Sequence, residues 1–254
     1  MSRLNDSWFE FKGVKSNDMG VRIMSAHLLS RGEMRGVQET VAARDGYLWI
    51  SDDSLKQFDA KFTCWASQSN MRACTAWLNG NGMLRFSHEQ NAQYSARPIK
   101  AIEFKRVTLD ADPLYEFTIT FTCQPYAYVY PAAADITITS SGTGFTALGT
   151  YFALPRLAIY GSGAFSVTIS GGGHSSSMFF TGVPSDGIVV DSELMDALTM
   201  DGAGLLNGCV LSNSDDFFRI WPGANTLTWG LGSGDEEESG SITKIVLTPR
   251  WRWL

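Results

Sequence analysis

The sequence predicts a mainly β protein with two domains, and three observations support this. Short runs of alternating apolar and polar residues recur throughout the 254 residues, separated by Gly, Asn, Asp and Ser, as in half-buried antiparallel strands. Hydrophobic residues make up 44% of the chain and charged residues only 18%, which suits packed cores rather than disorder. The charge balance shifts near the middle: 15 Lys and Arg face 14 Asp and Glu up to Tyr130, but 5 face 12 beyond it.

The first domain is placed at residues 1–132, and its clearest strand is Leu114–Cys123. Every second residue from Tyr115 to Cys123 is apolar or cysteine, and the residues between them are Glu or Thr. Shorter runs of the same kind predict strands at Tyr47–Ile50, Phe58–Trp65 and Arg97–Arg106. These strands predict a β-sandwich-like domain.

One segment of the first domain has helical spacing instead. Apolar residues recur every three or four positions from Met71 to Leu78, behind a capping Ser69 or Asn70. The Asn-Gly-Asn-Gly run that follows is typical of a turn and predicts a new strand near Met83. The first domain is therefore expected to contain one short amphipathic helix.

Residues 133–254 form the second domain, after a stretch rich in Ala, Thr, Ser and Gly. No segment there has convincing helical spacing, and roughly eight short strands are expected at the spacing of a jelly-roll or lectin-like sandwich. The clearest runs are Asp135–Thr139, Arg156–Tyr160, Phe165–Ser170, Gly187–Asp191, Phe217–Trp221, Thr226–Trp229 and Ile242–Pro249.

Several classes of function are disfavoured. Neither half carries the basic stripe that a phosphate backbone requires, so nucleic acid is not expected as a direct ligand. The four cysteines include no CxxC pair and are expected to be buried free thiols. Neither a signal-like apolar stretch nor a membrane-spanning window is present, so the chain is expected to stay in the cytosol unless a larger particle carries it out.

The common catalytic motifs are absent, and no catalytic residue, metal ligand or cofactor is expected. The three histidines are scattered singly, without a second ligand at the spacing typical of zinc sites. Asp191 and Glu193 are the acids that a cell-wall hydrolase would use, and hydrolysis by this pair is one hypothesis for the function. The acidic run Asp235–Glu238 is interpreted as a solvated loop tip.

The segment Phe9–Val21, FEFKGVKSNDMGV, resembles the opening of the distal tail proteins of long-tailed bacteriophages. Further segments resemble landmarks of that family in the same order, which carries the resemblance over nearly the whole chain. They are Arg44–Gly46 (RDG), Trp77–Gly80 (WLNG), Thr120–Tyr126 (TFTCQPY), Gly161–Gly163 (GSG), Ile188–Glu193 (IVVDSE), Trp221–Trp229 (WPGANTLTW) and Pro249–Trp253 (PRWRW). One departure is Ala42-Ala43, where many relatives carry glycine.

The resemblance implies a galectin-like β-sandwich for the second domain and a structural role in the virion, at the tail tip or baseplate, after assembly in the bacterial host cytoplasm. In this family the first domains close into a homo-hexamer, a ring stacked on the tail tube protein and bound to the tail-associated lysin or fibre hub. DNA passes through the ring without specific binding, and the second domains of some relatives carry receptor-binding proteins for host adhesion. Enlarged relatives contain an inserted carbohydrate-binding module, for which this chain has no spare length.

A ring needs contacts between subunits, and the resemblance favours the N-terminal region for them. A strand from Met19 to Leu29 followed by a projecting polar loop, Ser30–Thr40, would reach an adjacent subunit; an ordinary surface loop is the alternative. The candidate interface residues are Phe9, Phe11, Asp18, Met19, Val21, Arg31 and Arg35.

The alternative to a structural role is a carbohydrate-binding role, in which the chain is a lectin-like adhesion module. Such a module would stack Trp221, Trp229 or Trp251 on a sugar ring. Tryptophans in the core of a sandwich are the commoner case. The sequence names neither the host nor the receptor.

Overall fold

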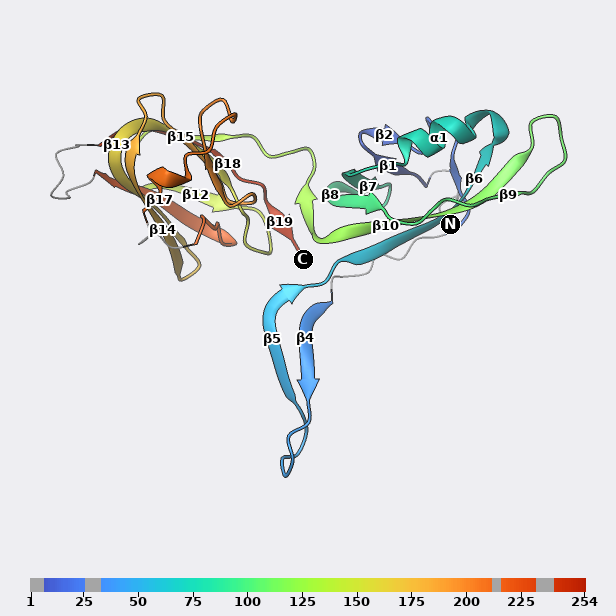
Figure 1. The fold of residues 1–254 in the computed structure, drawn as a ribbon, viewed down its shortest axis with the longest axis horizontal. Coiled ribbons are helices and arrows are strands. Elements are labelled where there is room, and N and C mark those ends of the chain that lie inside the picture. The colour runs from blue at the N-terminus through green and yellow to red at the C-terminus, as the bar shows by residue number, and fades with distance from the viewer. Residues whose placement is uncertain (1–6, 26–32, 212–215, 232–239) are drawn as a thin grey trace. The chain divides into compact units, whose positions relative to one another are not determined.

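The structure, a computed structural model, describes residues 7–25, 33–211, 216–231 and 240–254 (Figure 1). It is mainly β, as the alternating pattern predicted, with a single α-helix in the described part of the chain. The chain divides into two compact units, Met1–Tyr130 with Leu254, and Pro131–Trp253. The sequence placed the boundary two residues later, after residue 132.

Unit 1 is built on an antiparallel sheet in the order β2-β1-β7-β8-β10-β6-β3. The long strand β10 pairs with β6 along one edge, and with β9 and then β8 along the other. The strands of this sheet are β1 (Phe9–Phe11), β2 (Val14–Lys15), β3 (Arg22–Ile23), β6 (Phe58–Ser67), β7 (Gly82–Phe86), β8 (Glu89–Pro98), β9 (Phe104–Arg106) and β10 (Leu114–Val129).

Alternation along the strands builds the core of unit 1. Phe117, Ile119 and Phe121 of β10 are buried, as predicted, while the residues between them face the other side of the sheet. Phe9 lies against Phe62 with ring centroids 4.9 Å apart and against Phe121 at 5.5 Å. Each such ring contributes about 1.5–3 kcal/mol by leaving water.

The predicted helix is confirmed as α1 (Met71–Trp77), preceded by a 3-10 turn at Gln68–Asn70. Asn70 is the N-cap residue, but its side chain makes no capping hydrogen bond. The helix is fastened at its other end, where Trp77 Nε1 donates to the Phe11 carbonyl at 2.9 Å and the indole stacks on Phe9 at 5.5 Å. These contacts join two segments of the family resemblance, FEFKGV and WLNG.

The prediction of a polar loop at Ser30–Thr40 was wrong. Met34–Glu39 forms strand β4, which pairs with β5 (Leu48–Leu55) in a separate two-stranded sheet. Backbone pairing forms this hairpin although neither face of β4 is buried. Figure 1 shows the hairpin extending away from the rest of unit 1. The strand predicted from Met19 to Leu29 is reduced to β3, and residues 26–32 lie outside the described ranges.

Unit 2 is organised around β13 (Arg156–Gly171), which takes part in two ladders on each edge. Its first half pairs with β15 and β18, and its second half with β14 and β17. These curled antiparallel sheets are consistent with a β-sandwich. The other strands are β11 (Ile136–Ile138), β12 (Thr143–Ala147), β14 (His174–Val183), β15 (Ile188–Asp191), β16 (Asp196–Leu198), β17 (Gly223–Leu231), β18 (Ser241–Thr248) and β19 (Arg252–Trp253), with a 3-10 turn at Asn207–Cys209.

Two strand predictions need correction, and several strands were not predicted, β14 among them. Arg97–Arg106 is interrupted, because the chain leaves the sheet after Pro98 and returns as β9. Phe217–Trp221 is not a strand: it is irregular, with one bridge at Ile220 that holds it to the body of unit 2. Strand β14 was missed, because its first half is a run of serines without apolar alternation.

Candidate functional site

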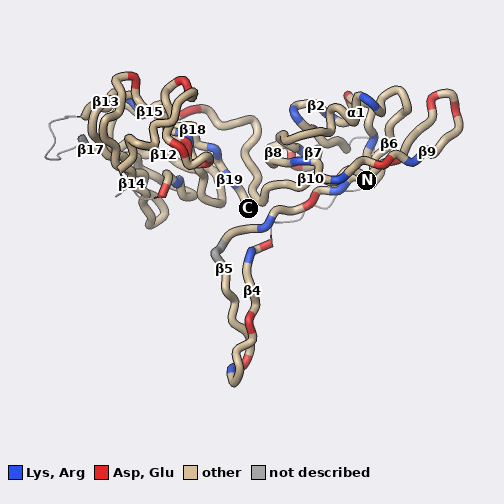
Figure 2. Tube along the Cα trace, in the orientation of Figure 1, with Lys and Arg blue, Asp and Glu red and all other residues tan. Residues whose placement is uncertain are grey.

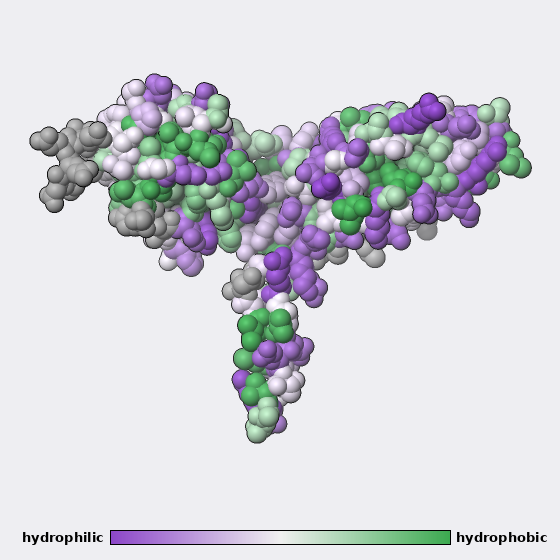
Figure 3. All heavy atoms as spheres, in the orientation of Figure 1, coloured by the Kyte–Doolittle hydropathy of each residue, from purple (hydrophilic) through white to green (hydrophobic). Residues whose placement is uncertain are grey.

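The β4–β5 hairpin carries many exposed apolar side chains. Seven of its large apolar side chains are 37–60% exposed: Met34, Val37, Val41, Tyr47, Leu48, Trp49 and Ile50. Figure 3 shows apolar side chains along the length of the hairpin, between polar ones, and Figure 2 shows that it also carries acidic and basic residues. A soluble protein rarely exposes a contiguous apolar surface without a partner for it.

Both faces of the hairpin contribute to this surface. On one face the register pairs Val37 with Ile50 and, next along, Glu39 with Leu48. On the other face Trp49 lies across Gly36, since a Cβ atom placed on Gly36 would come within 2.5 Å of the indole Cζ2. The indole of Trp49 therefore packs against the backbone of Gly36, where no side chain intervenes, and the rest of the ring stays exposed to a partner.

The tip and the base of the hairpin hold its shape. At the tip, Arg44 N donates to the Val41 carbonyl at 3.2 Å, and Ala43 has a left-handed backbone at φ 61°. Glycine adopts this conformation with less strain than alanine does. At the base, Lys56 N donates to the Glu33 carbonyl at 2.7 Å; their side chains also form an exposed ion pair of small energetic value.

The structure separates the interface residues expected from the sequence into different environments. Phe9, Phe11 and Val21 are fully buried in unit 1, so their side chains are unavailable to a neighbouring subunit. Asp18 is exposed and Met19 is half-buried in the turns that follow β2.

The remaining two interface candidates lie in the hairpin region. Arg35 is exposed on β4, while Arg31 lies outside the described residues. The apolar residues of the hairpin were missed as candidates. The run Tyr47–Ile50, four large apolar residues in succession, was the available signal, because a strand with one buried face would alternate.

The three tryptophans considered for sugar stacking also differ. Trp251 is 3% exposed and belongs to the core of unit 2. Trp229 is half-buried on β17. Trp221 is half-buried, and the ring of His174 stacks on it with centroids 5.3 Å apart. One face of the Trp221 indole is therefore already covered by another aromatic ring.

The acids considered for hydrolysis are held by arginines. Arg250 donates to both oxygens of Asp191, and Glu193 lies 3.3 Å from Arg250 and 3.4 Å from Arg252. Burial alone would raise the pKa of Asp191, but the hydrogen bonds and charge of Arg250, with the N–H groups of Leu194 and Glu193, lower it below its ordinary value. A general acid needs a raised pKa, so Asp191 is unsuited to that role.

Three of the four cysteines are buried, as the sequence predicted, and the fourth is not. Cys64, Cys74 and Cys123 are buried free thiols, and Cys209 is half-buried. Burial raises the pKa of Cys64 and of Cys123 to about 12. These two thiols are therefore protonated and inert at neutral pH.

Within the described residues, no group of three or more His, Cys, Asp and Glu side chains is arranged to hold a metal ion. None of the helices in the described ranges has the length and apolar character needed to cross a membrane. The acidic run Asp235–Glu238 lies outside these ranges.

Comparison with known proteins is informative at the level of structure. No family model matches the sequence, and no curated protein matches it. Among solved structures, the chain is similar to the Dit protein (gp 19.1) of SPP1, described as a paradigm of the hub adsorption apparatus in phages that infect Gram-positive bacteria. The TM-score is 0.64 at 17% identity, over 98% of this chain and 99% of that one. The likeness establishes a shared fold across both units.

Proposed function

We propose that this chain, which has the fold of a phage Dit protein over nearly its whole length, is a structural component of a phage tail tip or baseplate. It acts through subunit contacts and not through catalysis. Six copies form a ring through unit 1, and unit 2 presents a surface for the components that adhere to the host. The particle is assembled in the cytoplasm of the bacterial host.

One observation supports this proposal above the others, namely the apolar β4–β5 hairpin. The core of unit 1 is complete without it, since Phe9, Phe62 and Phe121 pack together beneath α1. The hairpin therefore contributes little to the folding of its own subunit. Its apolar faces instead suit burial against a neighbouring copy.

The partners follow from the same proposal. The ring stacks on the tail tube protein on one side and on the tail-associated lysin or fibre hub on the other, and DNA passes through without specific binding. The nearly balanced charge of residues 1–130 suits such a channel, because a strongly basic lining would retain DNA. Unit 2 carries receptor-binding components on its exposed surface.

The ring is tested by light scattering after size-exclusion chromatography, together with negative-stain images. The wild-type chain is expected to form rings of six, alone or with its tail partners. Val37→Asp and Ile50→Asp each place a charge on one apolar face of the hairpin, and each is expected to give monomers. Thermal unfolding of these variants should resemble that of the wild type, since neither residue belongs to the core.

Leu148→Asp is the matched control. Leu148 is 63% exposed but belongs to unit 2, so this variant should still form rings. A wild-type protein that stays monomeric at high concentration and with tail partners present would refute the ring. Hairpin variants that assemble as well as the wild type would remove the hairpin from the interface.

A further inference from the structure

The sheet of unit 1 contains a gap on one edge of β10. The ladder between β9 and β10 ends at the pair Phe104 and Phe117, and the ladder between β8 and β10 begins at Pro98 and Phe121. Between them, residues 99–103 leave the sheet. Among the described residues, nothing pairs with residues 118–120 on this side.

The backbone of Thr118 and Thr120 points into this gap. In an antiparallel ladder, alternate residues direct both N–H and C=O to the same side. Val107 N donates to the Leu114 carbonyl, so the even-numbered residues of β10 face the edge of β9 and β8. The intervening Ile119 is paired with Phe62 of β6 on the opposite edge. In the described part of the chain, two backbone donors and two backbone acceptors thus lack a strand partner on this edge, at Thr118, which is half-buried, and at Thr120, which is 5% exposed.

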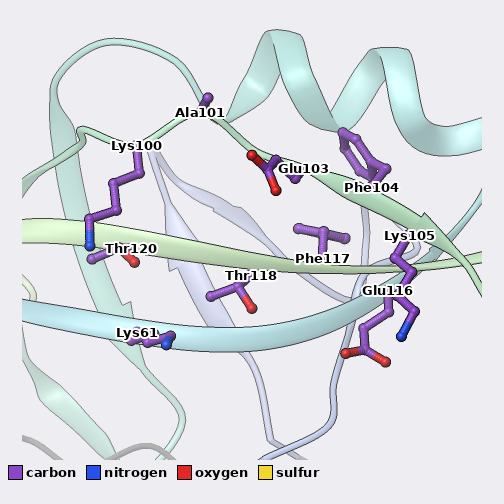
Figure 4. Close-up of a pocket in the computed structure, with 10 residues that line it drawn as sticks. All are labelled: Lys61, Lys100, Ala101, Glu103, Phe104, Lys105, Glu116, Phe117, Thr118 and Thr120. Atoms are coloured by element: carbon purple, nitrogen blue, oxygen red, sulfur yellow. The ribbon is translucent and has the colours of Figure 1, made fainter.

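A hollow of about 810 Å³ lies over this gap. Lys61, Lys100 and Lys105 line it together with Glu103 and Glu116, which leaves a formal charge of +1. Figure 4 shows Lys100 extending toward Thr120 and Lys105 next to Glu116. Lys61 lies directly across the strands from Thr120. The positive charge is therefore concentrated beside Thr120.

We propose that this gap binds a short, extended, acidic segment of a partner polypeptide. The backbone of such a segment satisfies the N–H and C=O groups of Thr118 and Thr120 and completes the ladder. Its carboxylate lies between Lys61 and Lys100. This site is distinct from the β4–β5 hairpin and does not depend on the ring.

A peptide fits the gap better than another anion does. Phosphate accepts hydrogen bonds but has no N–H group for the carbonyls of Thr118 and Thr120. A nucleic acid would bring a row of negative charges close to Glu103 and Glu116, which line the same hollow. A peptide whose acidic side chains are separated by neutral residues meets both requirements.

Site-resolved hydrogen exchange of the full chain tests the proposal. In the free protein, the amides of Thr118 and Thr120 should exchange on the order of 100-fold faster than that of Ile119, because only Ile119 is paired. The probe is a capped five-residue peptide, Thr-Asp-Val-Glu-Thr, at millimolar concentration. It should slow exchange at Thr118 and Thr120 and leave the hairpin unchanged.

Matched peptides and variants separate the two parts of the recognition. The Asn and Gln analogue of the peptide tests the charge, and a version methylated at its central amide tests the ladder. Lys61→Gln and Lys100→Gln should each weaken binding about fivefold, as for an exposed ion pair. Lys244→Gln, in unit 2, should leave binding unchanged, and equal melting temperatures would show that the variants are folded.

Four results would overturn the proposal. The first is slow exchange at Thr118 and Thr120 in the free protein, because the gap would then be closed. The second is equal protection by the neutral or the methylated peptide. The third is equal protection by inorganic phosphate alone, which would indicate a simple anion site. Absence of protection by the acidic peptide would equally reject it.

Discussion

Arg250 binds both carboxylate oxygens of Asp191, through Nη1 at 2.6 Å and Nη2 at 2.8 Å. Arg250 does so from a left-handed backbone conformation, at φ 49°. Glu193 extends the contact by pairing with Arg250 and Arg252. The pair thus links the segment after β18 to the end of β15, and it joins the sequence landmarks IVVDSE and PRWRW.

The first prediction concerns this pair. Asp191→Asn should lower the free energy of unfolding at pH 7 by about 1.5–3 kcal/mol, because it removes two charge-assisted hydrogen bonds and leaves Arg250 with Glu193 as its remaining acidic partner. The folded pKa of Asp191 is depressed, so the stabilisation is present above the unfolded pKa, near 4, and is lost as the pH falls through the folded value. Denaturant titrations at several pH values should therefore show the wild type and the variant converging in acid.

Asp186→Asn serves as the control for that series, since Asp186 is exposed. Its stability should follow that of the wild type at every pH. A constant difference between Asp191→Asn and the wild type down to strong acid would contradict the assigned pKa direction.

The second prediction separates core from interface at β1. Phe9→Ala should cost about 3–5 kcal/mol in unfolding free energy, because the ring is fully buried among Phe62, Phe121 and Trp77. Asp18→Ala, at an exposed position, should change stability by less than about 0.5 kcal/mol. Urea denaturation measures both. A Phe9→Ala variant of normal stability that no longer assembles would instead support an interface role.

The third prediction concerns the packing of Trp49 against Gly36. Gly36→Val should displace the indole, because the new side chain would occupy the space beside Cζ2. Hydrogen exchange in β4 and β5 should then accelerate, while the melting temperature of the protein stays unchanged. Ala43→Gly, which removes the left-handed alanine at the tip, should slow exchange there. Slower exchange in Gly36→Val than in Ala43→Gly would argue against these roles of Gly36 and Ala43 in the hairpin.

The fourth prediction concerns thiol reactivity. In the native protein at pH 8, a thiol reagent should modify Cys209 alone at an appreciable rate, because Cys64, Cys74 and Cys123 are buried. All four thiols should react in denaturant. Mass spectrometry of digested protein identifies the labelled residue. Fast native labelling of Cys64 or Cys123 would contradict their burial and their raised pKa values.

The sequence predicted those strands and the helix that have one face buried and the other exposed to solvent. β10 was recognised because its apolar residues, such as Phe117, occur at every second position. α1 was recognised because its apolar residues, such as Cys74, occur at every third or fourth position. β4 and the first half of β14 were missed, because an exposed or serine-rich strand leaves no apolar alternation to read.

The candidate interface was harder to predict, for a related reason. Phe9 and Phe11 flank Glu10 in the pattern of a buried strand, and the same pattern suits a core and a contact equally well. Exposure decides between them, and exposure depends on residues far away in the sequence. The apolar run Tyr47–Ile50 becomes informative only when the partner strand β4 is seen to leave both faces open.

The place of β13 in both sheets of unit 2 has a consequence for the order in which the chain folds. β14 follows it at once through the turn at Gly171–His174, whereas β17 and β18 are synthesised much later. During translation, the edge of β13 that later pairs with β17 and β18 is therefore still unpaired when the β13–β14 hairpin has formed. This edge can then pair incorrectly with strands of other copies. We expect the yield of soluble protein to depend on how soon the C-terminal strands are translated.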